Sequence, residues 1–572
     1  MRMNTIMTVR GVCAASWAAL LLGSCETPVV PEPVLPKLDF ALPRTQSATG
    51  ALLERMRGEW RMLTRGDLTD DERLQALKAY NGDLLAYIRC LRYEVLEAGQ
   101  GSPAAYMNDI DVVQEGLPAT IPLNLIYDDV VPACDVHFSE LEEHYALRGL
   151  GVPLVGVIPA ENVERLQEER VLNIRTKGTV STVTAVLEFP AGPAGAKPRL
   201  HLVPRLRHDT FPIRRLNYYL AADFSAPIEV YWSLTDVHDD RFLGLLRPQK
   251  LRDTTGLSSL EQYNPSKIPV ILTHGLLSSA DTFCNLVNRL LTDEQIRNNF
   301  QFWYFNYPTG NAWVVTADHY RKALAQARQT LDPRHRNRNW DNMVVMGHSM
   351  GGLITHYSQC TEPWKMLSNS GIVKSENIKG LDASHVHKSF SDPAMERFRT
   401  QFFFEPVKAG AVFYLATPHR GAPLASYRIV KAINKLISLP ANILNEAVSL
   451  VTLKRDMFLL NPSDLVDWFT SLDQLSPDGY AIRGLRGLQV RNVPTYSVIG
   501  DCGDNDTPHS SDGVVPYWSS HIGWGEETIV PSDHHVQDDK ATAEYIKEVL
   551  HTYLETHPAR KTDKPQGARG MR

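Results

Sequence analysis

The sequence predicts an α/β fold in its second half, with a mostly parallel sheet covered by helices on both faces and an α+β region before it. From residue 268, apolar strand-like runs alternate with helical segments, which is typical of a parallel sheet. A Gly-x-Ser-x-Gly pattern lies directly between one such strand and the helix that follows it. Two segments, 360–410 and 424–490, are longer than simple connections, and we expect them to form a helical cap.

Composition excludes several broad classes of protein. The chain has 572 residues, of which 43% are apolar and 22% are charged, as in an ordinary globular protein rather than a disordered one. Lys and Arg number 59 against 65 Asp and Glu, which gives a net charge of −6. A protein that grips nucleic-acid phosphates should show a basic surplus, so a nucleic-acid partner is disfavoured.

The N-terminus, residues 1–24, is expected to be an export signal. Basic residues precede an apolar run that is too short to span a bilayer but suits a signal-peptide core. The run ends in "LLGSC", which resembles the bacterial lipobox, whose cysteine is lipidated; the alternative is a plain secretory signal. Residues 25–37 are rich in proline and should form an extended spacer. We therefore expect an exported lipoprotein of the bacterial cell envelope, anchored through Cys25 at the outer membrane or the periplasmic face.

Residues 38–260 are expected to form an α+β region of unassigned role. Two segments within 50–98 carry apolar residues at helical spacing, and three β-rich runs, including "APIEVYWSL", lie within 150–250. The region is either a separate small module or an elaboration packed on the domain that follows it in the sequence. At the other end, residues 557–572 are polar and basic, and we expect them to be a disordered tail.

Cysteine usage gives no sign of a metal or redox centre. Besides the cysteines at positions 13 and 25, the chain contains Cys90, Cys134, Cys284, Cys360 and Cys502. Five is an odd number, so at least one of these thiols is left without an intrachain disulfide. None of them has the spacing of a metal or redox motif. We expect neither a metal nor an organic cofactor.

Residues 261–556 are expected to form the catalytic domain, in which strands and helices alternate. Unbroken apolar character predicts buried strands, and apolar periodicity predicts the helices between them. The expected strands are 268–273, 301–307, 343–346, 411–416 and 495–499, and the expected helices lie near 314–330, from about 350 onward, and at 541–555.

Ser349 is the candidate nucleophile, because it lies at the centre of Gly-His-Ser-Met-Gly between the third strand and its helix. That placement is the context in which a nucleophile elbow forms. The residues two before and two after the serine must leave room in a strained turn, and Gly347 and Gly351 do so. The turn lifts the serine hydroxyl above the sheet, and the N-terminus of the helix favours negative charge there.

A serine nucleophile needs a base, and the base needs an orienting carboxylate; in this fold the order is Ser, Asp or Glu, then His. We prefer Asp512 as the carboxylate because an apolar segment follows it and can pin its loop. Three other acids in the same loop compete with it or form a calcium site, namely Asp501, Asp504 and Asp506. In the loop before the last helix, His534 is preferred as the base over its neighbour His535.

An acyl-transfer site also needs donors for the oxyanion. One is expected to be the backbone N–H of Met350, the residue after the nucleophile. The other should come from the loop after the first strand, where "THGLLSS" turns the chain immediately after "IPVILT". The N–H of Leu276 in that loop is the second candidate donor.

The second half resembles lipase/esterase-type α/β-hydrolases, and it is particularly similar to bacterial hydrolases related to the "HGL" lipases and the GPI inositol deacylase group. The resemblance covers about 268–550 and rests on "IPVILTHGLLSS", "QFWYFNYPTGN", "VVMGHSMGGL", "LATPHRGAP", "SLDQLSP", "SDGVVPYWSS" and "VPSDHHVQ". It implies an α/β-hydrolase fold, with Asp512 as the acid and His534 as the base. His535 departs from the family pattern, in which a small residue usually stands at that position.

We therefore expect a serine hydrolase that cleaves carboxylic esters through an acyl-enzyme intermediate. The membrane anchor and the apolar stretch 431–453 favour a lipid or another apolar acyl ester as substrate. A thioesterase or amidase would use the same triad, and the same fold also suits a non-catalytic envelope scaffold.

Overall fold

The computed structural model of the protein describes residues 46–97, 110–114, 127, 129–159, 178–191, 196–234, 255–259, 261, 263–371, 373, 400–423, 473–503 and 507–560. The predicted signal, Cys25, the spacer, the apolar stretch 431–453 and residues 561–572 lie outside these ranges. Among the helices within them, none is both long enough and apolar enough to cross a bilayer.

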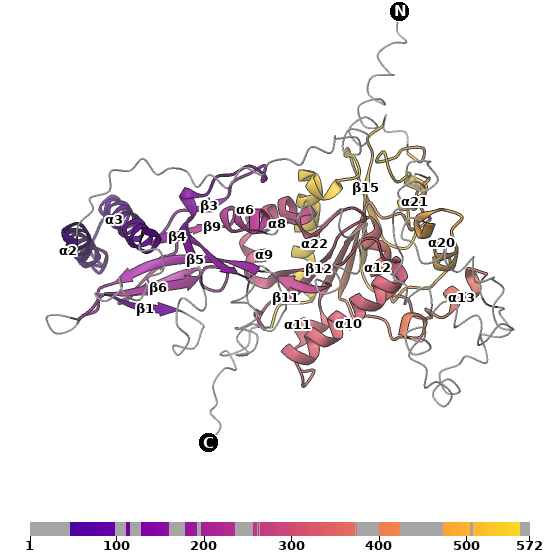
Figure 1. Ribbon diagram of the computed structural model, residues 1–572, viewed down its shortest axis with the longest axis horizontal. Helices are drawn as coiled ribbons and strands as arrows, with labels where there is room; N and C mark the ends of the chain where they lie inside the picture. The colour runs from indigo at the N-terminus through magenta and orange to yellow at the C-terminus, as the bar shows by residue number, and fades with distance from the viewer. Residues whose placement is uncertain are drawn as a thin grey trace, which may run out of the picture. The chain divides into compact units, whose positions relative to one another are not determined.

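Seven strands form the sheet of the second half (Figure 1). In spatial order they are β10 (Gly256–Ser259), β12 (Phe300–Asn306), β11 (Ile268–Thr273), β13 (Val344–His348), β14 (Ala411–Leu415), β15 (Thr495–Gly500) and β16 (Glu526–Val530). β10 is antiparallel to β12, and the other neighbouring pairs are parallel. The mixed α/β character predicted from the strand–helix rhythm is confirmed. Two strands were not predicted: β10, which precedes the expected domain start at 261, and β16.

Helices cover this sheet and link its strands. The longer ones are α8 (Cys284–Leu290), α10 (Trp313–Leu331), α12 (Met350–Ser358) and α22 (Lys540–Thr556). Shorter elements are η4 (Ala280–Phe283), α9 (Glu294–Asn299), α11 (Arg338–Asp341), α13 (Lys365–Asn369), η7 (Asp473–Leu475), α20 (Tyr480–Leu485), α21 (Tyr517–Ser520) and η8 (Val536–Asp538). The helices expected near 314–330, from about 350 onward and at 541–555 correspond to α10, α12 and α22.

The sheet has a hydrophobic core on each face. Val270 and Leu272 of β11 pack in a core with residues of α8, α9 and α22. Ile271, which lies between them, joins a second core with residues of α10 and α12. Successive side chains of a strand point to opposite faces, so a strand buried on both faces reads as one apolar run. For this reason both ends of β11 could be predicted from the sequence.

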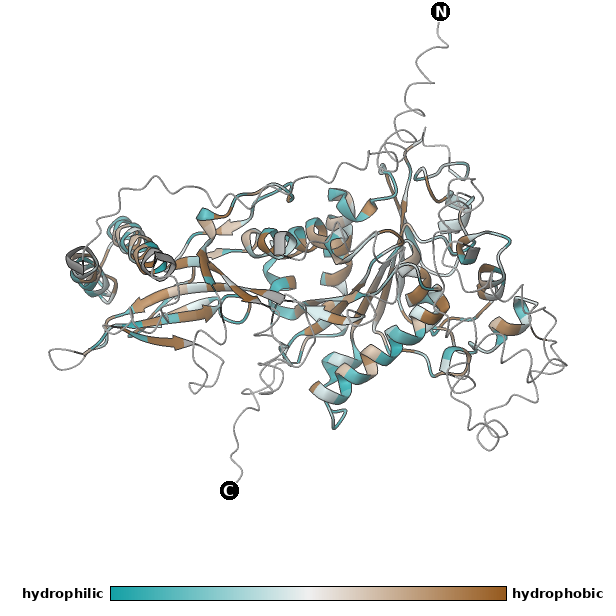
Figure 2. Ribbon diagram, in the orientation of Figure 1, coloured by the Kyte–Doolittle hydropathy of each residue, from teal (hydrophilic) through white to brown (hydrophobic). Residues whose placement is uncertain are grey.

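The N-terminal region contains a second sheet of five strands, in the order β1-β6-β5-β4-β2. These are β1 (Asp111–Gln114), β6 (Arg199–Pro204), β5 (Gly178–Glu188), β4 (Val152–Pro159) and β2 (Asp129–Pro132). Figure 2 shows hydrophobic residues concentrated along these strands. The two helices expected within 50–98 are α2 (Gln46–Leu63) and α3 (Asp70–Glu97). Smaller elements are η2 (Ala133–Asp135), β3 (Ala146–Leu147), β7 (Thr210–Ile213), β8 (Leu216–Tyr219) and β9 (Ala222–Asp223).

The prediction that "APIEVYWSL" is β-rich is wrong, because this segment belongs to helix α6 (Ser225–Leu234). Its Val, Ile, Tyr and Trp residues favour strands intrinsically. The Asp223 carboxylate, however, accepts hydrogen bonds from the backbone N–H groups of Ser225 (3.1 Å) and Ala226 (2.8 Å) and so caps the helix. Pro227 in the first turn suits a helix start as well. Local capping and burial therefore outweigh strand propensity here.

The N-terminal region and the second-half sheet share one hydrophobic core. Phe224 and Tyr231 are buried in the same cluster as Val270 of β11 and Tyr304 of β12. The ring of Tyr231 stacks on that of Tyr304 at 6.4 Å, and the Arg297 guanidinium lies 4.7 Å from the centre of the Phe224 ring. These contacts join α6 and the residue before it to β11 and β12 of the second-half sheet.

A chain that begins at Gly256 is expected not to fold stably. It would expose the apolar surface that Phe224 and Tyr231 cover, at roughly 1.5–3 kcal/mol for each large side chain removed from the core. Near-ultraviolet circular dichroism and limited proteolysis of the shortened chain would measure this. A cooperative melt and protease resistance equal to those of the longer chain would contradict the shared core.

Candidate active site

Ser349 occupies a strained turn between β13 and α12. Its backbone has φ 53° and ψ −122°, in a region that L-residues rarely adopt. A side chain at Gly351 would collide with the carbonyl oxygens of Thr273 and His274 at the end of β11. The tight approach of α12 to β11 therefore requires glycine there, as the elbow pattern predicts.

The structure brings Ser349, His534 and Asp512 into one hydrogen-bonded series. His534 Nε2 lies 2.9 Å from Ser349 Oγ, and His534 Nδ1 lies 2.7 Å from Asp512 Oδ2. All three residues are buried. Ser349 follows β13, Asp512 lies in the loop after β15, and His534 lies between β16 and α22. A hydroxyl, an imidazole and a carboxylate in this order match the requirement for an activated serine.

The loop around Asp512 holds its carboxylate in place. Asp512 Oδ1 accepts hydrogen bonds from the backbone N–H groups of Val514 (2.8 Å) and Val515 (2.5 Å), so Oδ2 is directed to His534. Asp501 lies elsewhere in the loop and accepts a hydrogen bond from the N–H of Gly503 at 2.9 Å. Asp504 and Asp506 lie outside the described residues. Of the two candidate acids that the structure describes, Asp501 and Asp512, it is Asp512 that contacts His534.

Of the two adjacent histidines, His534 faces Ser349. His535 is half exposed and pairs with Asp533, its Nδ1 lying 3.4 Å from Asp533 Oδ1. Its hydrogen bond to Asp533 raises the pKa of the His535 imidazole above its ordinary value. His348, within the elbow, donates from Nε2 to the backbone carbonyl oxygen of His534 at 2.9 Å. The elbow thus holds the His534 backbone as well as presenting Ser349.

The loop that carries Leu276 runs directly beside Ser349. A Cβ atom at Gly275 would lie 2.9 Å from Ser349 Cβ, so the approach of the two backbones depends on glycine. The Tyr307 hydroxyl donates to the His274 carbonyl oxygen at 2.6 Å, and the two rings stack at 4.2 Å. Burial lowers the pKa of His274 to about 4, so it is neutral at pH 7. No function was predicted for Tyr307 from the sequence, although it lies in the "FNYPTGN" motif.

Met350, the other candidate oxyanion donor, is the first residue of α12. The first N–H groups of a helix have no acceptor within that helix, so the Met350 N–H is suited to receive a developing negative charge. The side chain of Met350 is fully buried in the core under α10 and α12. This packing anchors the start of the helix, and with it the direction of the N–H.

His356 and His419 form a buried pair in the same half of the molecule. Their Nδ1 atoms lie 2.9 Å apart, so one imidazole donates to the other. Burial lowers the pKa of His356 to about 3, and burial together with the neighbouring His356 lowers the pKa of His419 well below its ordinary value. Both are therefore neutral at pH 7, and within the described part of the chain the imidazole that hydrogen-bonds to Ser349 is that of His534. The prediction that His419 belongs to loop structure agrees with this arrangement.

Within the described residues, no group of three or more His, Cys, Asp or Glu side chains is placed to hold a metal ion. The thiols of Cys284 and Cys360 are buried, and burial raises the pKa of each above its ordinary value. Both are thus held in the protonated form, which is the unreactive one.

No protein-family model matches the chain, and no curated protein matches it. Among solved structures, it is similar to the mature lipase BlEst2 of Bacillus licheniformis, with 12% identity and a TM-score of 0.27 over 51% of this chain and 94% of that one. It is also similar to a lipase-esterase related protein from Clostridium acetobutylicum, with 11% identity and a TM-score of 0.25 over 52% and 99% of the two chains. A third is the RedJ thioesterase of Streptomyces coelicolor, with 13% identity and a TM-score of 0.24 over 52% and 95%.

Proposed function

We propose that this protein is a serine hydrolase of the α/β-hydrolase type that cleaves carboxylic esters. The observation that carries the proposal is the hydrogen-bonded series Asp512–His534–Ser349 on the strained turn between β13 and α12. The backbone conformation of Ser349 is energetically unfavourable, and such a conformation persists only where the surrounding structure holds it in place. Here the strain presents a hydroxyl to an imidazole that is itself oriented by a buried carboxylate.

In the proposed first step, Ser349 Oγ attacks the ester carbonyl carbon while His534 Nε2 takes the hydroxyl proton. The carbonyl π electrons move to its oxygen, and the backbone N–H groups of Leu276 and Met350 stabilise that oxyanion. Collapse of the tetrahedral intermediate expels the alcohol oxygen, which receives the proton from the His534 imidazolium. Asp512 keeps Nδ1 protonated and stabilises the charged ring throughout.

In the second step, water replaces the alcohol. His534 takes a proton from the water as its oxygen attacks the acyl carbonyl carbon, and the same donors hold the second oxyanion. Ser349 then leaves with the proton returned by His534, which releases the carboxylic acid. Each atom of this cycle is supplied by the ester, by water or by the chain's own residues.

We further propose that the substrate is a lipid or another apolar acyl ester and that the protein acts at the bacterial cell envelope. The proposal is supported by the sequence of residues 1–37, with Cys25 as the expected lipid anchor, and by the apolar stretch 431–453. An enzyme held at a membrane by an acyl chain meets lipid substrates at high local concentration.

A panel of p-nitrophenyl esters, from short to long acyl chains, tests this function on the chain that begins just after Cys25. We expect hydrolysis with an optimum at medium or long chains and a rise in rate above the concentration at which the substrate forms micelles. A short-chain optimum with no such rise would contradict the lipid part of the proposal. If the protein hydrolyses only thioesters or only amides with the same acyl chains, the proposed ester substrate is replaced by a thioester or an amide.

A further inference from the structure

A segment of the N-terminal region, residues 139–145, lies against α8 and the start of α22, next to the loop that carries the candidate base. Its first residues are held by Glu229 of α6, which is itself buried. The Glu229 carboxylate accepts hydrogen bonds from the backbone N–H groups of Ser139 (2.8 Å), Glu140 (3.0 Å) and Leu141 (3.1 Å). These hydrogen bonds attach the start of the segment to α6.

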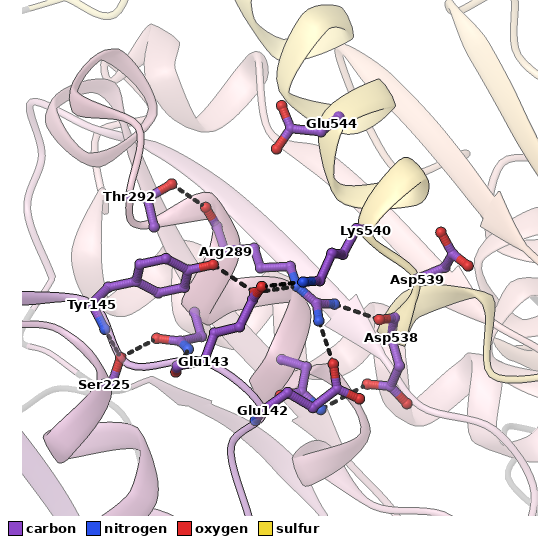
Figure 3. Close-up of polar contacts among 12 residues, drawn as sticks. Glu142, Glu143, Tyr145, Ser225, Arg289, Thr292, Asp538, Asp539, Lys540 and Glu544 are labelled. Atoms are coloured by element: carbon purple, nitrogen blue, oxygen red, sulfur yellow. Dashed lines mark hydrogen bonds and ion pairs between the residues drawn. The ribbon is translucent and has the colours of Figure 1, made fainter.

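Arg289 of α8 is the centre of the contact between this segment and the catalytic half (Figure 3). Its side chain is only 4% exposed. Its Nε donates to Glu143 Oε2 at 2.8 Å and its Nη2 donates to Glu142 Oε2 at 2.5 Å. The remaining terminal nitrogen, Nη1, donates to the backbone carbonyl oxygen of Asp538. One buried guanidinium thus joins two carboxylates of the segment to the end of η8.

Glu143 makes a second link, to the start of α22. Its Oε1 lies 2.6 Å from Lys540 Nζ, while its Oε2 also accepts from the Tyr145 hydroxyl at 2.5 Å. The hydrogen bonds from Lys540 and then Tyr145, with Arg289, lower the pKa of Glu143 to about 2, so it is charged at neutral pH. Asn285 of α8 adds a bridge: it accepts from the N–H of Glu142 at 3.3 Å and donates to Asp538 Oδ1 at 3.2 Å.

The anchored Asp538 closes the short turn that begins immediately after His534. The N–H of Asp538 donates to the His535 carbonyl oxygen at 2.9 Å, and Val536 between them is fully buried. Backbone movement at Asp538 would therefore be passed to His534. Figure 3 shows Glu142, Glu143 and Arg289 gathered on one side of Asp538 and Lys540.

We propose that Glu143 is a positioning residue, through which the N-terminal region holds the His534 loop in line with Ser349. This inference rests on the proposed hydrolase function and gives residues 38–260 a part in it. Glu143 touches neither substrate nor the reacting atoms; it acts through Arg289 and Lys540. Because a misplacement of about 1 Å costs up to ~10²-fold in rate, a loosened base loop would slow the chemical step without weakening substrate binding.

The test compares Glu143→Gln with Asp129→Asn. Asp129 pairs with Arg92 at 2.7 Å within the N-terminal region, and the two carboxylates are matched in exposure, at 24% for Glu143 and 29% for Asp129. We expect Glu143→Gln to lower kcat about 10-fold at a KM within about twofold of wild type, and to slow fluorophosphonate labelling of Ser349 by the same factor. Asp129→Asn should change neither. A kcat of Glu143→Gln within twofold of wild type, or an equal loss in Asp129→Asn, would overturn the inference.

Asn285→Ala supplies a second, independent variant, because Asn285 is only partly buried and bridges the same two segments. We expect it to lower kcat in the same way, and the double variant with Glu143→Gln to lose less than the product of the two single losses, since both act through Asp538. If Glu143→Gln does not fold, an unchanged kcat in Asn285→Ala overturns the inference. Wild-type protein that neither hydrolyses esters nor labels at Ser349 refutes the proposed function instead.

Discussion

Replacing Ser349 with alanine is expected to abolish ester hydrolysis, with a loss of about 10⁶-fold in kcat. The substitution removes Oγ, the atom 2.9 Å from His534 Nε2, and with it the nucleophile of the acyl-enzyme. The helical start at Met350 and the glycines of the turn remain, so the fold should be kept. Steady-state hydrolysis of the best p-nitrophenyl ester, together with fluorophosphonate labelling, measures the loss.

The control for Ser349→Ala is a measurement of its thermal stability. Ser349 adopts positive φ, and alanine there bears the same backbone strain as serine, so the melting temperature should change little. Loss of both activity and labelling in a folded Ser349→Ala protein is the expected result. Residual hydrolysis near the wild-type rate in that protein would show that another group performs the reaction, and the proposed mechanism would fall.

The second large effect is expected at His534 and should be absent at its neighbour. His534→Ala removes the ring that contacts both Ser349 and Asp512, and loss of the base in a working triad costs about as much as loss of the nucleophile, ~10⁶-fold. His535→Ala removes a half-exposed ring paired with Asp533, so kcat/KM should stay within about twofold of wild type. Both values come from the same steady-state assay.

The adjacent pair makes its own control, because both substitutions alter the same loop and the same residue type. A general disturbance of the loop would lower activity in both variants. A large loss of activity in His535→Ala with a small loss in His534→Ala would identify His535 as the base. The loop would then have to adopt another conformation, in which His535 faces Ser349.

Much of the fold was predictable because strands that are buried on both faces consist almost entirely of apolar residues. The strands β11 and β14 are buried along their whole lengths, so they read as unbroken apolar runs. β16 was missed because it lies at the edge of the sheet and begins with two glutamates, so it lacks that run. α6 was misread because strand propensity is local information, whereas its cap at Asp223 and its packing depend on the surrounding structure.

The candidate site was predictable to the extent that its chemistry demands a local pattern. The turn at Ser349 needs small neighbours between a strand and a helix, and the order of acid and base along the chain follows from the fold. The hydrogen bond from Tyr307 to His274 and the contacts of Arg289 with Glu143 and Asp538 leave no such pattern. They join residues far apart in the chain, and each of them alone reads as an ordinary surface or core residue.

The core that joins both halves of the chain has a consequence for the order and speed of folding. It collects Ala133 and Phe224 from early in the chain with Ile546 and Tyr553 of α22, the last helix. Contacts between residues so distant in sequence slow folding, since a long loop must close before they form. During synthesis, the apolar faces of α6 and β11 would stay exposed until α22 is made, so we expect the nascent chain to depend on protection from aggregation until this helix packs.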